Sequence, residues 1–243
     1  MDFEIDKVNI PFDNDWKKIS ISVSGGADSA LLSYLLLRHI SLEDLNIEVH
    51  IISNVRMWKT RPWQRYNSIS VYNWLVQEFP DVNIVRHEGF IAPDIEYGRI
   101  GPIIKDEYGN MKSGDQITAR AYAEYICTIN KINAWYAGIT MNPQGVKIPN
   151  GMPDREPDTN QSEPLVEVHN GMYVCHPFRH TTKDWIVRQY NEYGIMELFD
   201  ITRSCEGEFE GLDYTNYVPG QVVPTCDECF WCKEREWAIE QSK

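Results

Sequence analysis

Six small or polar residues near the start of the chain, "SGGADS" (Ser24 to Ser29), follow a β-branched stretch and precede a leucine-rich one. Adjacent glycines let a backbone approach a ligand closely, and the two serines add hydroxyl donors. At a strand-to-helix junction, loop N–H groups and the helix N-terminus point into one concavity, which favours an anion. Asp28 could cap the helix or help to hold a metal. The pattern favours phosphate binding over its simpler alternative, a tight turn with a serine cap.

The spacing of this hexapeptide excludes two common nucleotide-binding loops. It lacks the GxxxxGK[ST] pattern of P-loop NTPases, and it lacks the GxGxxG pattern of dinucleotide-binding folds. It resembles instead the SGGxDS signature of the N-type ATP pyrophosphatases, or PP-loop superfamily, which carry it at the first strand-to-helix junction. The resemblance implies that the loop holds the pyrophosphate end of ATP. An acceptor oxygen then attacks the α-phosphorus, which leaves an adenylylated acceptor and free pyrophosphate.

Cysteines gather at the C-terminal end, where four of the six are Cys205, Cys226, Cys229 and Cys232. The last three form "CDECFWC", whose two overlapping CxxC steps can wrap a metal with backbone N–H groups turned toward the sulfurs. A fourth cysteine completes a tetrahedral zinc site. An iron–sulfur cluster is a competing use of four thiolates, and redox thiols without a metal are a third. The spacing favours structural zinc, and Cys127 and Cys175 are expected to be ordinary buried residues.

The hexapeptide and the C-terminal "TRSC…CDECFWCKER" together resemble the 7-cyano-7-deazaguanine synthase (QueC) family of queuosine biosynthesis. That family has a Ser-Cys pair, here Ser204-Cys205, then a CxxCxxC triplet and a nearby arginine, here Arg235. "GMPDRE" (151–156) is similar to its Tyr-Pro-Asp-Cys-Arg element, and "TTKDWIV" (181–187) to its Ser-Lys-x-Glu-Ile helix start. "YAGIT" (136–140) matches its fourth strand. The order of motifs is kept from Ile19 to about Ile239.

The resemblance implies a ligase that converts 7-carboxy-7-deazaguanine, ammonia and ATP into the nitrile, by adenylylating first the carboxylate and then the amide. It assigns ATP and Mg²⁺ binding to a set of residues that match by position: Ser24, Gly25, Gly26, Asp28, Ser29, Gly138 and Lys183. Asp28 and Lys183 are the expected catalytic residues, with Lys183 as a cationic clamp on the phosphates. Magnesium and a lysine would neutralise charge on the leaving pyrophosphate.

Substrate contacts are expected from Arg120, Asp154 and Arg155, although each would by default be a solvated surface charge. Two substrate segments of the family are replaced here, one by "SNVRMWKTRPWQRYNS" and one by "SGDQITARAY". The sequence therefore leaves the acceptor open. It could be another carboxylate, a protein terminus or a tRNA base. A non-catalytic nucleotide-sensing zinc module is the alternative from a different class.

The elements that must position these residues alternate between strand and helix. Strands are indicated at 17–24, 47–55, 82–88 and 134–140, a hairpin at 165–178, and helices at 28–40, 68–79, 116–132 and 181–194. This order predicts an α/β fold with a doubly wound, mostly parallel sheet of the adenine nucleotide alpha hydrolase type. Two expected loops, 89–115 and 141–161, would open on the same edge as the hexapeptide. We expect a nucleotide-binding domain at 1–200 and a zinc-binding segment at 201–243 packed on it.

Composition limits the partners. The 243 residues carry a net charge of −13, and the longest basic cluster is "MWKTRPWQR" (57–65), so extended nucleic-acid binding is not expected. No stretch reaches the roughly 18 apolar residues that a membrane span needs, and the acidic start is not typical of a signal peptide. The sequence therefore predicts a cytoplasmic enzyme that acts on a 7-deazapurine carboxylate and ammonia, with a homodimer possible.

Overall fold

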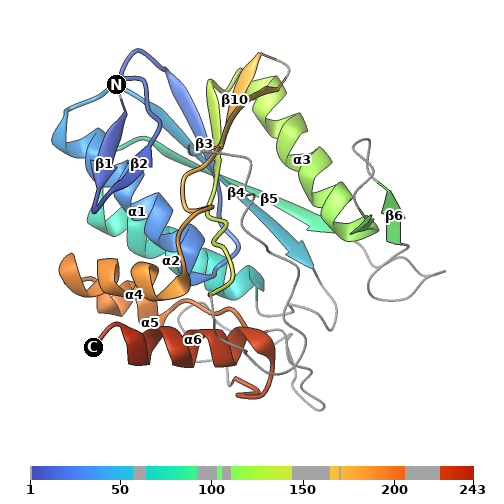
Figure 1. Ribbon diagram of the computed structural model, residues 1–243. Coiled ribbons are helices and arrows are strands. Elements are labelled where there is room, and N and C mark those ends of the chain that lie inside the picture. The colour runs from blue at the N-terminus through green and yellow to red at the C-terminus, as the bar shows by residue number, and fades with distance from the viewer. Residues whose placement is uncertain are drawn as a thin grey trace.

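The computed structural model describes residues 2–56, 64–91, 103–105, 111–143, 165–169, 171–205 and 225–243. Its centre is a six-stranded sheet in the order β5-β4-β3-β8-β10-β9 (Figure 1). The strands are β3 (Lys18–Ser22), β4 (Glu48–Arg56), β5 (Ile84–Ile91), β8 (Ala134–Ala137), β9 (Leu165–His169) and β10 (Met172–His176). Neighbours pair in parallel, except for the antiparallel pair β9 and β10. The predicted α/β fold with a mostly parallel sheet is confirmed.

Helices cover both faces of this sheet (Figure 1). One face carries α1 (Ala27–Leu42), α2 (Gln64–Glu78), α4 (Lys183–Glu192), α5 (Met196–Asp200) and α6 (Phe230–Gln241), and the other carries α3 (Gly114–Asn130). Alternate residues of a strand point to opposite faces: Ile19 and Ile21 pack with the leucines of α1, whereas Ser20 contacts Cys127 of α3. Among the described helices, none has the length and apolar character that a bilayer crossing requires.

The chain order places a switch point between β3 and β8. From β3 the chain adds β4 and then β5 on one side, and it then crosses to β8 on the other side of β3. In open α/β sheets, ligands bind outside the carboxyl ends of the strands at such a point. The hexapeptide follows β3, and Gly138 follows β8. The topology therefore predicts a ligand site at this edge of the sheet.

The structure also contains elements that the sequence pattern does not predict. β1 (Phe3–Ile5) and β2 (Val8–Ile10) form a hairpin in the polar lead-in. β6 (Ile103–Lys105) and β7 (Met111–Ser113) form another within 89–115, where a loop is predicted. Strands of three residues are too short to show a clear alternation. The C-terminal helix α6 packs against α4 and adds Ala238 to the core around α1, while the domain boundary at residue 200 stays a prediction.

Candidate functional site

The hexapeptide turns the chain from β3 into α1, and its two glycines meet different surroundings. Gly25 has a φ of +80°, and a Cβ there would lie 2.8 Å from both Asn67 Cβ and Ser68 N on α2. A side chain at this position would therefore be both strained and blocked. Gly26 is the N-cap of α1 with extended backbone, and a Cβ there would meet only ordinary contacts at 3.4–3.6 Å. Glycine is thus required for folding at position 25, whereas at position 26 the missing side chain leaves space beside the loop.

Hydroxyl groups and the start of α1 shape the rest of the loop. Ser29 Oγ donates to Gly26 O at 3.0 Å and accepts a longer bond, 3.3 Å, from Ser24 N–H. The first intrahelical bond of α1 runs from Ala30 N–H to Gly26 O at 3.1 Å. The N–H groups of residues 27–29 therefore precede the helical ladder and, with the helix dipole, favour an anion.

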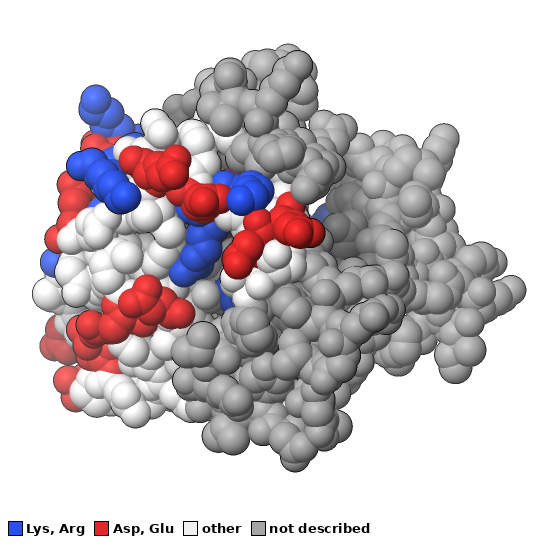
Figure 2. Space-filling view, turned by 90° about the horizontal axis from the view of Figure 1, so that it is seen from below, with Lys and Arg blue, Asp and Glu red and all other residues white. Residues whose placement is uncertain are grey.

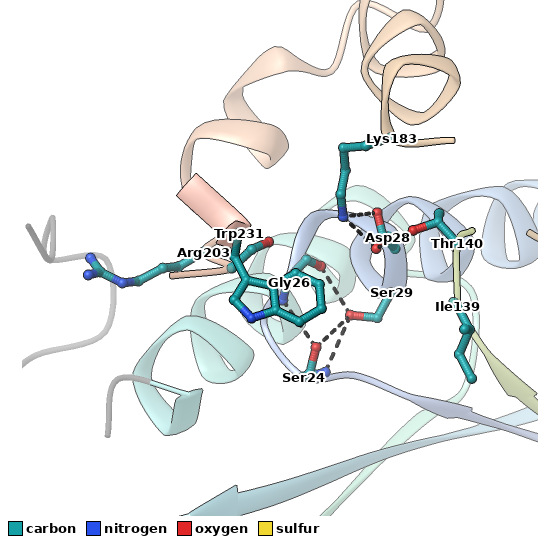
Figure 3. A pocket seen from close by; sticks show the side chains of 11 residues that line it. Ser24, Gly26, Asp28, Ser29, Ile139, Thr140, Lys183, Arg203 and Trp231 are labelled. Atoms are coloured by element: carbon teal, nitrogen blue, oxygen red, sulfur yellow. Dashed lines mark hydrogen bonds and ion pairs between the residues drawn. The ribbon is translucent and has the colours of Figure 1, made fainter. Parts of the chain in front are cut away.

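A cavity of about 220 Å³ opens in front of this loop (Figure 3). Its lining comes from the hexapeptide, the segment after β8, the start of α4 and the C-terminal region: Ser24, Gly26, Asp28, Ser29, Gly138, Ile139, Thr140, Lys183, Arg203, Ser204 and Trp231. A concave site with a few convergent polar groups is the usual form of a small-molecule site. The cavity also lies at the switch point between β3 and β8.

Asp28 and Lys183 form an ion pair in this cavity. The side chain of Lys183 is only 3% exposed, and its Nζ lies 2.5 Å from each carboxylate oxygen of Asp28. Thr140 Oγ1 also donates to Asp28, at 3.4 Å. Arg203 points its side chain away from the cavity (Figure 3). Among the described residues that line the cavity, Lys183 is therefore the cation that an anionic ligand would meet, and such a ligand would compete with Asp28 for it.

Gly138 allows β8 to approach the first turn of α1. A Cβ on Gly138 would lie 2.8 Å from the carbonyl carbon and oxygen of Asp28 and 2.9 Å from Ser29 N. Because these are backbone atoms, no side-chain rotation could relieve the clash. Beyond it, Met141 N–H donates to Thr181 O at 2.9 Å, which ties the segment after β8 to the start of α4. The glycine therefore sets the width of the cavity.

The predicted substrate residues do not join this group in the described structure. Arg120 lies on α3 and pairs with Glu124 one helical turn away, with Nε 2.7 Å from Oε1. It does not line the cavity. Asp154 and Arg155 lie outside the described residues. Contacts to an acceptor therefore stay predictions.

Several lining residues were missed by sequence reasoning: Ile139, Thr140, Arg203, Ser204 and Trp231. A signal was present for two of them, since Ser204 precedes Cys205 and Trp231 precedes Cys232. This signal points to cavity residues only if the cysteines lie beside the glycine loop. That proximity is a property of the fold.

The four C-terminal cysteines form a compact group. Cys205 Sγ lies 3.4 Å from Cys226 Sγ, and Cys232 Sγ lies 3.9 Å from Cys226 Sγ and 3.6 Å from Cys229 Sγ. All four sulfurs lie within 4.8 Å of one another and could hold a metal ion. Backbone N–H groups of Cys226 and Cys229 turn toward the sulfurs of Cys205 and Cys226, at 3.4 and 3.3 Å. The structure thus brings together the predicted ligand set.

Packing four thiols together separates their pKa values. Hydrogen bonds from Cys205 and Cys232 lower the pKa of Cys229 to about 2, and the contacts with Cys205 and Cys229 raise the pKa of Cys232. One thiolate forms readily, and its charge opposes the next. A bound cation would remove that opposition. By contrast, burial raises the pKa of Cys127 to about 11 and that of Cys175 to about 12, as expected for ordinary core thiols.

Comparison with known proteins does not place the chain in a family. No protein-family model matches the sequence, and no curated protein matches it either. Among the solved structures similar to the chain is the U34-tRNA thiolase NcsA from Methanococcus maripaludis with its 4Fe-4S cluster, at a TM-score of 0.43 and 11% identity. The similarity covers 92% of this chain and 63% of that one. A functional proposal therefore depends on the residues of this chain.

Proposed function

We propose that the chain binds ATP at the glycine loop and splits it to AMP and pyrophosphate, transferring the adenylyl group to an acceptor. The observation that carries this proposal is the placement of Lys183, a buried ammonium group aimed into a cavity whose floor is a helix N-terminus. Burying a cation at the start of a helix is unfavourable by itself. The ion pair with Asp28 offsets part of that cost, and an anion of high charge in the cavity would offset more of it.

Different residues of the site would contact different parts of the magnesium–triphosphate complex. Loop N–H groups and the hydroxyls of Ser24 and Ser29 would hold the leaving pyrophosphate, and Lys183 would neutralise its charge. Asp28 would supply a carboxylate ligand to the magnesium that accompanies ATP. Catalysis would come from positioning and electrostatics, because an acceptor carboxylate is already a nucleophile and needs no general base.

For the acceptor we propose the carboxylate of 7-carboxy-7-deazaguanine, on the sequence resemblance to the 7-cyano-7-deazaguanine synthase family. The carboxylate oxygen attacks the α-phosphorus and pyrophosphate leaves, after which ammonia displaces AMP and gives the amide. A second ATP adenylylates the amide oxygen, and loss of AMP leaves the nitrile. On the face that Figure 2 shows, the basic side chains of the described residues lie beside acidic ones.

We propose zinc as the occupant of the four-cysteine centre. A tetrahedral ion with Zn–S bonds of about 2.3 Å places its sulfurs about 3.8 Å apart. Three of the Sγ–Sγ separations here are 3.4, 3.6 and 3.9 Å, and all four sulfurs lie within 4.8 Å of one another. In a four-iron cluster each thiolate binds a different iron atom, so its sulfurs must lie further apart than those around one ion. The compact group of sulfurs therefore supports a single ion.

The test of the proposed reaction is an assay with ATP, 7-carboxy-7-deazaguanine and ammonium. AMP, pyrophosphate and the nitrile should appear, and release of ADP would contradict the mechanism. Gly26→Val should abolish turnover, because its methyl groups would enter the cavity. Gly26→Ala is the matched control for folding, since its Cβ would meet contacts no closer than 3.4 Å. Normal turnover in Gly26→Val would refute the role of the loop.

The same assay separates the rival functions. AMP release with another carboxylate, a protein terminus or a tRNA base, and none with the deazapurine, would support the same adenylylation reaction with a different acceptor. ATP binding without AMP formation across all acceptors would favour a nucleotide-sensing module. The sensing alternative is kept because an ion pair such as that of Lys183 and Asp28 fits a binding site without catalysis as well.

A further inference from the structure

Three residues separate the glycine-loop cavity from a second cavity of about 570 Å³. Arg203, Ser204 and Trp231 line both cavities and form a partition between them. Cys205 and Cys232 also line the second cavity. Side chains in a core are fixed by close packing on all sides. A partition with a cavity on each side is packed less closely on those two sides, so bonds to neighbouring elements help to set its position.

On one side the partition is bonded to the glycine loop. Arg203 N–H donates to Gly25 O at 2.8 Å. A Cβ on Gly26 would lie 3.5 Å from Arg203 O and 3.6 Å from Ser204 Oγ, so both atoms are in van der Waals range of the loop. Trp231 also faces the cavity, with its indole ring in front of Gly26 in the view of Figure 3. Displacing the partition would therefore change the mouth of the cavity.

On the other side the partition is tied to the cysteine centre by the chain itself. Ser204 immediately precedes Cys205, and Trp231 immediately precedes Cys232. Cys229, two positions before Trp231, is the N-cap of α6. A metal bound by these three cysteines would fix the chain on both sides of Trp231 and directly after Ser204.

One further tether does not depend on a metal. Arg235 of α6 donates to Thr202 Oγ1 at 3.0 Å and to Phe199 O at 2.9 Å. Its guanidinium carbon also lies 3.6 Å from the ring centroid of Phe199. These bonds hold α6 on the segment that leads into Arg203. Loss of the metal would therefore loosen the partition without releasing the helix.

We propose that metal binding at the four-cysteine centre and nucleotide binding at the glycine loop are coupled through this partition, with Ser204 and Trp231 as positioning residues. The metal fixes the partition against the glycine loop, and a bound nucleotide fixes the same residues from the other side. Each ligand then raises the affinity of the chain for the other by the same factor, as linkage requires. This inference rests on the proposed function, which supplies the nucleotide.

The test uses the zinc-loaded full chain. Zinc is allowed to distribute to equilibrium between the chain and a chromophoric chelator with and without Mg²⁺ and a non-hydrolysable ATP analogue, and binding of the analogue is measured in parallel by equilibrium dialysis. The saturating analogue should raise the affinity of the chain for zinc by about tenfold and so reduce zinc transfer to the chelator, within the usual range of coupling between sites. Analogue binding with no change in zinc transfer overturns the coupling alone. Failure of the analogue to bind overturns the proposed function and the coupling together.

Two tryptophan variants distinguish coupling from general stabilisation of the fold. Trp231→Ala removes the indole from the partition and should leave zinc transfer nearly insensitive to a saturating analogue. Trp237→Ala, on the same helix, removes a ring that packs against the core, and it should keep the wild-type ratio of zinc affinities with and without the analogue. A nucleotide that protected zinc only by stabilising the whole fold would give the same ratio in both variants, and that result would refute the role of Trp231.

Discussion

Lys183 and Asp28 are separated by 155 positions in the sequence, yet Lys183 Nζ lies 2.5 Å from both carboxylate oxygens of Asp28. The two side chains come from the first turns of α4 and α1. The segment after β8 lies between these helices, and Thr140 from that segment also donates to Asp28. The pair therefore joins the three chain segments that form the cavity floor.

Removing the charge of Lys183 should abolish nucleotide binding and destabilise the fold. Lys183→Met keeps the length of the side chain but leaves Asp28 only 17% exposed and without its cation, at a cost of about 3 kcal/mol. Adding Asp28→Asn should recover part of that loss, with a coupling energy of about 1 kcal/mol or more in a double-mutant cycle. Urea denaturation and equilibrium dialysis with an ATP analogue measure the two effects.

A second cation on α4 provides the matched control for this cycle. Arg188 NH1 pairs with Asp184 at 2.6 Å, but the Arg188 side chain is 43% exposed. Because exposed pairs contribute about 0.5 kcal/mol at most within one helix, Arg188→Met should change neither stability nor nucleotide binding appreciably. Wild-type nucleotide affinity in Lys183→Met would contradict the assignment of this lysine.

Two glycines have nearly the same φ, so alanine substitutions at the two positions distinguish the cost of backbone strain from the cost of a steric clash. Gly25 and Gly171 have φ of +80° and +81°, but a Cβ on Gly171 would have nothing within 4 Å, whereas one on Gly25 would clash with Asn67 and Ser68. Gly171→Ala should cost about 1 kcal/mol from backbone strain alone and keep nucleotide affinity. Gly25→Ala should cost clearly more and lose nucleotide binding. Equal losses of stability in the two variants would show that α2 does not hold the loop.

The parts of the site that sequence could predict are those with a local signal. The hexapeptide is recognisable because its glycines and serines are adjacent at one junction, and the central strands because buried parallel strands are rich in β-branched residues. The motif at the start of its helix predicts Lys183 as a phosphate contact, and the structure shows this residue in the lining of the cavity. Arg203 carries no such signal, and Trp231, whose neighbour Cys232 is a local signal for the metal site alone, reaches the cavity only after α6 packs on α4. A single sequence does not show which distant segments come together in the fold.

The metal content of the protein should depend on the four-cysteine group and not on the cysteines outside it. Protein purified without added zinc should carry about one zinc per chain, and Cys226→Ser should lose it and melt at a lower temperature, because the metal cross-links two distant segments. Cys175→Ala replaces a buried cysteine outside the group, and it should keep the metal even though it loses some stability. Less than about half an equivalent of zinc in the wild-type chain would contradict a structural zinc site.

The fold should lose stability in mild acid, because two of its histidines have lowered pKa values. Burial lowers the pKa of His39 and of His87 from the ordinary value of 6.5, and the charge of His50 lowers that of His87 further. His87 Nε2 lies 2.8 Å from His50 Nδ1, so a proton on both rings would be unfavourable. The folded chain therefore binds protons less readily than the unfolded chain below about pH 6.5.

The free energy of unfolding should accordingly be constant near neutral pH and fall as the pH drops from about 7 to about 5.5. Glu48 does not contribute in this window: Lys18 and His50 lower its pKa below 4.5, so its share of stability is lost only in stronger acid. His87→Gln should flatten the fall, whereas His180→Gln replaces an exposed histidine and should leave it unchanged. Urea denaturation at a series of pH values measures this. Stability that rises on acidification would show that protonated His87 is favoured in the fold, contrary to its half-buried place beside His50.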